Sequence, residues 1–156
     1  MTLVREAKLA SRATLCEWGR DVVLRESQAL EHLAHQIGES FAETVEILHA
    51  TMERGGRILL TGSGKSGLVA RKIAATFCST AAPAFFLHPA DAEHGDLGLV
   101  TAGDVLIVLS RSGSIEGLET VLAAAERLGV PILAWTCRGE SALAKHANVV
   151  VPLEVG

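Results

Sequence analysis

From Arg57 onward, short apolar segments alternate with segments that have helical periodicity. We expect strands at residues 58–60, 84–87, 104–109, 131–135 and 149–151, with helices at residues 68–79, 116–128 and 141–146. Strands that are apolar along their whole length are typical of a parallel sheet covered on both faces. The alternation therefore predicts an α/β fold with right-handed crossovers.

The N-terminal part of the chain predicts helices. Residues 3–53 contain no proline, and Gly38 is a natural break between two helical segments. In the second segment, apolar residues recur at spacings of three and four and form one stripe, made of Phe41, Val45, Leu48 and Met52. By the same rule, the helix at 68–79 has one apolar face, made of Val69, Ile73 and Phe77.

These elements predict one structural domain with two parts. Residues 1–54 are expected to form helices that pack on an α/β core at residues 55–156. The expected fold is a flavodoxin-like three-layer sandwich. Its five-stranded parallel sheet has the order 2-1-3-4-5, and an N-terminal helical segment precedes it.

Composition limits the partners. The 156 residues carry a net charge of −4, and Lys and Arg are dispersed, which argues against nucleic acid or a membrane as a partner. No apolar run reaches transmembrane length, and residues 1–6 lack the apolar stretch of a signal peptide. The three cysteines, Cys16, Cys78 and Cys137, form no CxxC pair and no zinc spacing. We therefore expect a cytoplasmic protein with reduced thiols.

The segment Gly62–Gly67, which we call the glycine loop, lies between the first expected strand and a helix. Its glycines, Gly62, Gly64 and Gly67, allow a tight turn and close approach of a ligand to the backbone. The helix N-terminus, Lys65 and the hydroxyls of Ser63 and Ser66 would together bind an anion such as phosphate. A tight turn without a ligand is the simpler alternative.

Two nucleotide-binding motifs are alternatives for the glycine loop. A Walker A motif requires a glycine where this chain has Leu59, so the motif is absent. The dinucleotide fingerprint G-x-G-x-x-G is matched. However, the acidic residue expected at the end of the second strand is missing, because the chain has Leu87, His88 and Pro89 there. A dinucleotide-binding fragment is weakened as an interpretation but stays open.

The third expected strand leads into a second hydroxyl-rich segment, Ser110–Ser114, which we call the serine loop. It contains Ser110, Ser112, Gly113 and Ser114. By itself it could be a helix N-cap with additional serines. In the predicted sheet order, strands one and three are neighbours, so the two loops border one crevice. Two such helix entrances suit the phosphate group of a small ligand.

The segment after the second expected strand concentrates titratable groups. Between His88 and Asp96 it holds two histidines, two aspartates and one glutamate, and the second histidine is His94. These residues predict proton transfer or metal binding, although a solvated loop is the alternative. Glu116, at the start of the following expected helix, is either a catalytic acid or a residue that complements the helix dipole.

At this point the motifs resemble a known family. The glycine loop, residues 71–77, the run His88-Pro89 with His94-Gly95-Asp96-Leu97-Gly98, and Ser110-x-Ser112-Gly113 occur in a familiar order. Over roughly residues 15–156, the chain resembles the sugar isomerase (SIS) domain of the arabinose-5-phosphate isomerases, in a short form without CBS modules. The run from His88 to Gly98 is the most specific part of this resemblance.

The resemblance implies an activity and roles for residues. The activity would interconvert ribulose 5-phosphate and arabinose 5-phosphate through an enediolate, for lipopolysaccharide or capsule sugars. Lys65 and His88 would be active-site residues, His94 would contact the substrate, and Ser66, Ser110 and Ser112 would hold the phosphate. No cofactor is required, although His88 could take an inhibitory zinc ion. The protein would be a homodimer or homotetramer with sites near the subunit interfaces.

The chain departs from the family pattern in two places. Arg111 and Ser114 replace an Asn and a Glu in the serine loop, and an acid of the family falls on Gly117, so that Glu116 would have to substitute. The family domain continues beyond the fifth strand with further catalytic side chains, so we expect a C-terminally shortened domain. A non-catalytic module that binds sugar phosphates is therefore the alternative function.

Overall fold

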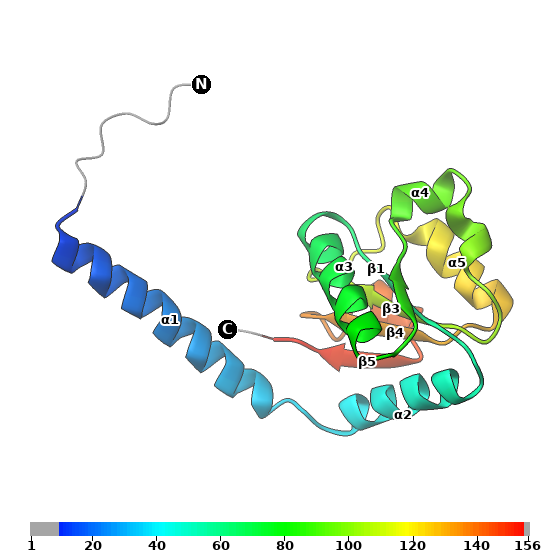
Figure 1. Ribbon diagram of the computed structural model, residues 1–156, viewed down its shortest axis with the longest axis horizontal. Coiled ribbons are helices and arrows are strands. Elements are labelled where there is room, and N and C mark those ends of the chain that lie inside the picture. Colours follow the sequence, from blue (N-terminus) through cyan, green and yellow to red (C-terminus); the bar gives the residue numbers. More distant parts are fainter. Residues whose placement is uncertain (1–9, 155–156) are drawn as a thin grey trace. The chain divides into compact units, whose positions relative to one another are not determined.

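The computed structural model describes residues 10–154 (Figure 1). These residues form two compact units that separate between His35 and Gln36. The first unit contains helix α1 (Arg12–Ala34), which begins where the Ser11 hydroxyl accepts a hydrogen bond from the Thr14 amide. None of the residues of α1 is buried. No helix among the described residues is long and apolar enough to cross a membrane.

The second unit contains a five-stranded sheet, in which every neighbouring pair of strands is parallel. Its elements are α2 (Glu39–Glu53), β1 (Ile58–Thr61), α3 (Gly64–Ser79), β2 (Ala84–Phe86), α4 (Pro89–Glu93), η1 (Asp96–Leu99), β3 (Val105–Leu109), α5 (Glu119–Leu128), β4 (Ile132–Thr136), η2 (Leu143–Lys145) and β5 (Val149–Pro152). The strand order β2-β1-β3-β4-β5 confirms the predicted topology.

Two hydrophobic cores lie on the two faces of the sheet. Because side chains alternate along a strand, Leu59 belongs to one core, and its neighbours Ile58 and Leu60 belong to the other. The first core contains residues of α5, and the second contains residues of α2 and α3. Figure 1 shows α3 and α5 on opposite sides of the sheet. This arrangement confirms the expected three-layer sandwich.

The apolar stripe predicted for α2 is only partly the face that packs. Leu48 is buried together with Thr44 and Thr51. Phe41 and Val45, however, are 42% and 48% exposed, so only part of the predicted stripe faces the core. The spacing of apolar residues gave the period of the helix, but contacts with the sheet determine its rotation about its axis.

The predicted face of α3 also needs correction. Val69 is 51% exposed, and the buried residues of the helix are Gly67, Ala70 and Ala74. Ile73 and Phe77 lie half-buried beside them. Small side chains face the sheet because they let the helix axis come close to the strands, which excludes the larger Val69.

A buried ion pair joins the amino ends of β1 and β3. Asp104, whose side chain is 2% exposed, accepts hydrogen bonds from Arg57 Nε and Nη2 at 3.1 and 2.8 Å. Burial by itself would raise the pKa of Asp104. The hydrogen bonds from Arg57 and Thr101 outweigh burial, so the pKa lies below its ordinary value. Hydrogen bonding to Asp104 also raises the pKa of Arg57.

Candidate functional site

Three of the predicted segments meet at the carboxyl ends of the strands. Leu60 pairs with Phe86 of β2, and Thr61 pairs with Val108 of β3. The glycine loop therefore leaves the sheet between the ends of β2 and β3. His88 follows β2, and the serine loop follows β3. In a parallel sheet this edge is where ligands usually bind.

The glycines of the glycine loop are required by close contacts. A Cβ atom on Gly62 would lie 2.8 Å from the carbonyl oxygen of Leu109, at the end of β3. A Cβ atom on Gly67 would lie 2.5 Å from the carbonyl oxygen of Gly62. Gly64 has a φ of 56°, which favours glycine. The loop is thus packed tightly against the strand that carries the serine loop.

The start of α3 presents hydrogen-bond donors. The helix begins at Gly64, four residues earlier than the predicted start at residue 68, so most of the glycine loop is its first turn. Ser63 is the N-cap residue, but its hydroxyl caps no backbone amide. Ser63 and Lys65 are exposed, and Ser66 is half-buried. Free amides, two hydroxyls and an ammonium group at a helix N-terminus form a favourable environment for an anion.

The serine loop is held by its own hydroxyl groups. Ser110 is nearly buried, and its hydroxyl donates to the Ser114 carbonyl at 2.9 Å. The Ser112 hydroxyl accepts from the Ser114 amide, and the Ser114 hydroxyl accepts from the Glu116 amide. The hydroxyl protons of Ser112 and Ser114 are not used in these bonds, and both residues are exposed. These two are therefore better placed than Ser110 to donate to a ligand.

Gly113 fixes the serine loop against a neighbouring turn. Its φ is 70°, and a Cβ atom there would overlap the Ser141 side chain. The Gly113 carbonyl also accepts a hydrogen bond from the Leu143 amide at 2.9 Å. Ser141 could not be identified from the sequence, because no local pattern connects it to a loop almost thirty residues earlier.

The two histidines lie at opposite ends of a short helix. The segment from 88 to 98, expected as a loop, contains α4 and the 3-10 helix η1. His88 is the N-cap of α4, and its Nδ1 accepts a hydrogen bond from the Ala90 amide at 3.2 Å. His94 is exposed at the C-cap. Their Cα atoms are thus about 9 Å apart along the helix axis, and the side chains do not form a pair.

Glu116 does not begin a helix. α5 starts at Glu119, and Glu116 lies exposed in the preceding turn. The turn continues through Gly117, whose φ of 72° is unfavourable for other residues and delays the helix start. The prediction that Glu116 complements the dipole from the first helical turn is therefore wrong, because Glu119 holds that position. Its catalytic role stays a prediction.

The described residues contain no group of three His, Cys, Asp or Glu side chains that could hold a metal ion. His88 Nε2 is not engaged by the Ala90 amide and could bind a metal, but residues 10–154 bring no two further ligands to it. This donor set does not fit a zinc ion held by one chain. Zinc at His88 stays a prediction.

Thr61 and Phe86 support the site and were not identified from the sequence. The Thr61 hydroxyl, which is buried, donates to the Leu87 carbonyl at 2.8 Å and joins the ends of β1 and β2. The Phe86 and His88 rings meet edge to face, with centroids 6.0 Å apart. The one indication of Thr61 in the sequence is that it is a polar residue at the end of an otherwise apolar strand.

Comparisons with known proteins agree with this geometry. A family model described as the SIS domain matches residues 52–156. The chain is 44% identical over 131 residues to the arabinose 5-phosphate isomerase KdsD of Pseudomonas aeruginosa, a match that covers 84% of this chain and 39% of the relative. It is 42% identical over 130 residues to KdsD of Francisella tularensis, which covers 83% and 40%. The chain thus spans about two-fifths of the length of these relatives.

A solved structure adds to these matches. The structure of E. coli CFT073 c3406 in complex with arabinose 5-phosphate superposes with a TM-score of 0.86 at 32% identity, and the match covers 94% of this chain and 77% of that chain. The family model accounts for more than half of the sequence, and the residues it matches include the glycine loop, the serine loop and both histidines. The chain therefore belongs to the SIS domain family.

Proposed function

We propose that this chain binds a pentose phosphate at the carboxyl ends of β1 to β3 and interconverts ribulose 5-phosphate and arabinose 5-phosphate. The observation that carries the proposal is the contact of Gly62 with the Leu109 carbonyl, because it joins the glycine loop to the strand that leads into the serine loop. The names of the relatives supply the choice of sugar.

The phosphate would lie between the two loops. The first turn of α3 offers backbone amides and the positive end of a 16-residue helix. Lys65 adds a positive charge, and Ser63, Ser66, Ser112 and Ser114 add hydroxyl donors. Ser110 and Gly113 would act by shaping the serine loop, since the Ser110 hydroxyl is engaged with Ser114.

The chemistry requires proton transfer between C1 and C2 of the open-chain sugar. A base removes the proton from the carbon beside the carbonyl and leaves the enediolate. A proton then moves from the hydroxyl on that carbon to the former carbonyl oxygen, and the base returns its proton to the former carbonyl carbon. Because His88 Nδ1 accepts from Ala90, the neutral imidazole carries its proton on Nε2. His88 would therefore donate a hydrogen bond to a sugar oxygen. Glu116 would be the base, Lys65 would stabilise the enediolate oxygen, and His94 would contact the sugar.

Incubation with ribulose 5-phosphate, followed by chromatographic detection of arabinose 5-phosphate, tests the activity. Lys65→Ala is expected to remove turnover and to weaken binding in calorimetry at least tenfold. Lys72→Ala is the matched control, because Lys72 is exposed on the same helix but lies outside the glycine loop. Equal binding by the two variants would contradict the phosphate site.

Binding without turnover would favour the second candidate, a non-catalytic sugar-phosphate module. The observation in its favour is Gly117, which stands where the resemblance places an acid. Space for a side chain exists there, since no atom lies within 4 Å of its Cβ position, but the positive φ is unfavourable for glutamate. If Glu116→Gln binds the sugar phosphate as tightly as the wild type, and the two proteins behave alike in the turnover assay, the non-catalytic module is supported.

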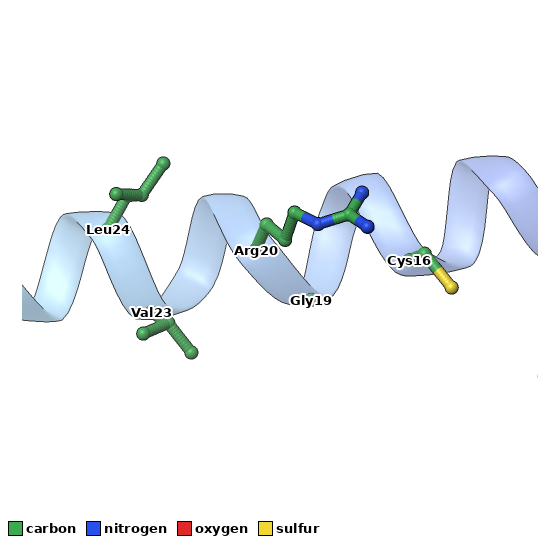
Figure 2. Close-up of a pocket in the computed structure, with 5 residues that line it drawn as sticks. All are labelled: Cys16, Gly19, Arg20, Val23 and Leu24. Carbon is green, nitrogen blue, oxygen red and sulfur yellow. The ribbon is translucent and has the colours of Figure 1, made fainter.

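We also propose that α1 pairs with α1 of a second copy of the chain. Large apolar side chains on α1 are exposed, among them Trp18 at 59% and Val22 at 53%. A hollow on the same helix is lined by Cys16, Gly19, Arg20, Val23 and Leu24, and Figure 2 shows how Gly19 leaves a gap among these side chains. An apolar helix surface of this kind requires a partner.

The charges of α1 favour an antiparallel pair of two copies. The part of α1 up to Arg25 carries three arginines together with Glu17 and Asp21, a net charge of +1, and the part that follows carries Glu26 and Glu31 without a compensating lysine or arginine. Antiparallel pairing places each basic half beside an acidic half. Light scattering should therefore give a dimer or a higher multiple, and Trp18→Glu with Val22→Glu should give a monomer. A wild-type monomer would instead indicate that α1 packs within its own chain.

A further inference from the structure

Phe86 contacts three different parts of the candidate site. Its ring meets the His88 ring with centroids 6.0 Å apart and an interplanar angle of 73°. The guanidinium carbon of Arg71 lies 5.0 Å from the centroid of the same ring. A Cβ atom on Gly67 would lie 3.4 Å from Phe86 Cζ, so the ring tip also reaches the glycine loop. One half-buried side chain therefore links α3, the glycine loop and the start of α4.

The geometry of the Phe86 ring suits orientation of a neighbour. A cation above the face of an aromatic ring is attracted to it, and so is a second ring at its edge. Both interactions favour particular orientations and add to the energy of packing. Among the described residues, Arg71 forms no ion pair, so the ring is the partner of its guanidinium. The cation thereby holds the ring, and the ring limits the positions that the His88 imidazole can take.

The position of β2 makes this support necessary. β2 is an edge strand and pairs only with β1 in the described sheet. The Thr61 hydroxyl ties its end at Leu87, but the chain then turns into α4, and within residues 10–154 the His88 ring has a single hydrogen bond, the one from the Ala90 amide. That bond holds Nδ1 in place. Further rotation of the imidazole is limited by the Phe86 ring.

Phe85 provides a natural comparison. It precedes Phe86 on the same strand, points to the opposite face, and its ring carries the Arg57 guanidinium at the same distance of 5.0 Å. Arg57 is bound to Asp104 at the amino end of the sheet, away from His88. The two phenylalanines are thus alike in chemistry and in having an arginine partner, and it is the Phe86 ring that meets the His88 ring and reaches the glycine loop.

We propose that Phe86 is a positioning residue, which orients the His88 imidazole and supports the glycine loop from a single ring stacked under Arg71. This proposal rests on the proposed isomerase function for its kinetic consequence. Loss of the ring would misplace His88 relative to the sugar, and a displacement of about 1 Å in an active site lowers turnover by up to about 100-fold. The contribution to kcat should therefore exceed the contribution to KM.

The decisive variants are Phe86→Leu and Phe85→Leu, compared by NMR and by kinetics. The His88 ring signals are assigned by their loss in His88→Gln, since the chain has six histidines. Phe86→Leu is expected to move the His88 signals, to lower kcat about 10- to 100-fold and to leave KM within about threefold of the wild type. Phe85→Leu is expected to leave the His88 signals and kcat unchanged, although it lowers the thermal midpoint.

Two more variants separate the contacts of the ring. Arg71→Gln is expected to move the His88 signals in the same direction as Phe86→Leu, because it removes the cation that holds the ring. Phe86→Tyr keeps the ring and should keep the His88 signals and kcat, but its hydroxyl extends from Cζ toward Gly67 and should raise KM. If Phe86→Leu fails to fold, these two variants still decide the question.

The outcomes separate this proposal from the proposed function. If the wild type turns over and Phe86→Leu leaves the His88 signals and kcat unchanged, the positioning role is refuted and the isomerase function stands. If the wild type lacks turnover but Arg71→Gln, which keeps the Phe86 ring, moves the His88 signals in the same direction as Phe86→Leu, and Phe85→Leu does not move them, the isomerase function fails and the positioning role stands. Equal effects of the two leucine variants on His88 would overturn the positioning role.

Discussion

The ion pair between Arg57 and Asp104 gives the sharpest prediction about stability. Replacing Asp104 by Ala removes the acceptor of five hydrogen bonds: three from the Arg57 amide, Nε and Nη2, and two from the Thr101 amide and hydroxyl. Removing one partner of a buried pair costs about 3–5 kcal/mol. The Arg57 side chain is 36% exposed and can regain water, so we expect the lower end, about 3 kcal/mol.

Thermal and urea denaturation measure this loss. For a domain of this size, about 3 kcal/mol corresponds to a fall in Tm of roughly 6–12 °C. Asp21→Ala is the matched control, because its carboxylate pairs with Arg25 on the exposed surface of α1. Such a pair contributes less than about 0.5 kcal/mol. A loss below about 1 kcal/mol for Asp104→Ala, or equal losses for both variants, would refute the reasoning.

The pH dependence tests the same pair independently. The folded protein holds the pKa of Asp104 below the ordinary value of 3.8, so the ionised carboxylate contributes stability at neutral pH. This contribution is complete above the unfolded-state pKa and is lost as the pH falls through the folded-state pKa. The difference in unfolding free energy between the wild type and Asp104→Asn should therefore shrink below about pH 4. A difference that is constant from pH 7 to pH 3 would contradict this cause.

Three further substitutions give expected outcomes. Gly67→Ala should cost about 1–3 kcal/mol in chemical denaturation and weaken sugar-phosphate binding, because its Cβ would lie 2.5 Å from the Gly62 carbonyl oxygen. Gly139→Ala is the control and should cost little, because no atom lies within 4 Å of its Cβ position and its φ is not positive. Thr61→Val should cost about 1–2 kcal/mol, since the Leu87 carbonyl loses its buried donor. Glu126→Gln should change Tm little, because its 2.6 Å contact with His146 is partly exposed and contributes about 0–1 kcal/mol.

The sheet and the positions of the loops could be predicted from the sequence. Apolar strands separated by helices leave few arrangements, and the chain adopts the expected order. The glycine loop was recognisable because only glycine allows the contacts seen at Gly62 and Gly67. Glycine requirements of this kind are local, so a pattern of neighbouring residues is enough to reveal them.

Contacts between distant segments could not be predicted in the same way. Arg57 and Asp104 are 47 positions apart, and no pattern in either segment indicates the other. The rotation of α2 and α3 depends on which side chains fit against the sheet, so the spacing of apolar residues does not reveal that Phe41, Val45 and Val69 are exposed. Ser110 and Ser112 make different hydrogen bonds within the serine loop, so their roles differ. The sequence does not show this difference, because both residues are serines.

Phe85 and Phe86 show where local and long-range information divide. Successive side chains of a strand point to opposite faces, so two consecutive phenylalanines in an expected strand must serve two different layers. The sequence alone supports that conclusion. It does not give the partners, because Arg57 precedes β1 whereas Arg71 lies within α3, and both arginines come from outside the strand. The helix or strand end that packs over an apolar residue therefore decides its role. It determines whether the residue contributes to the stability of the fold or to the candidate functional site.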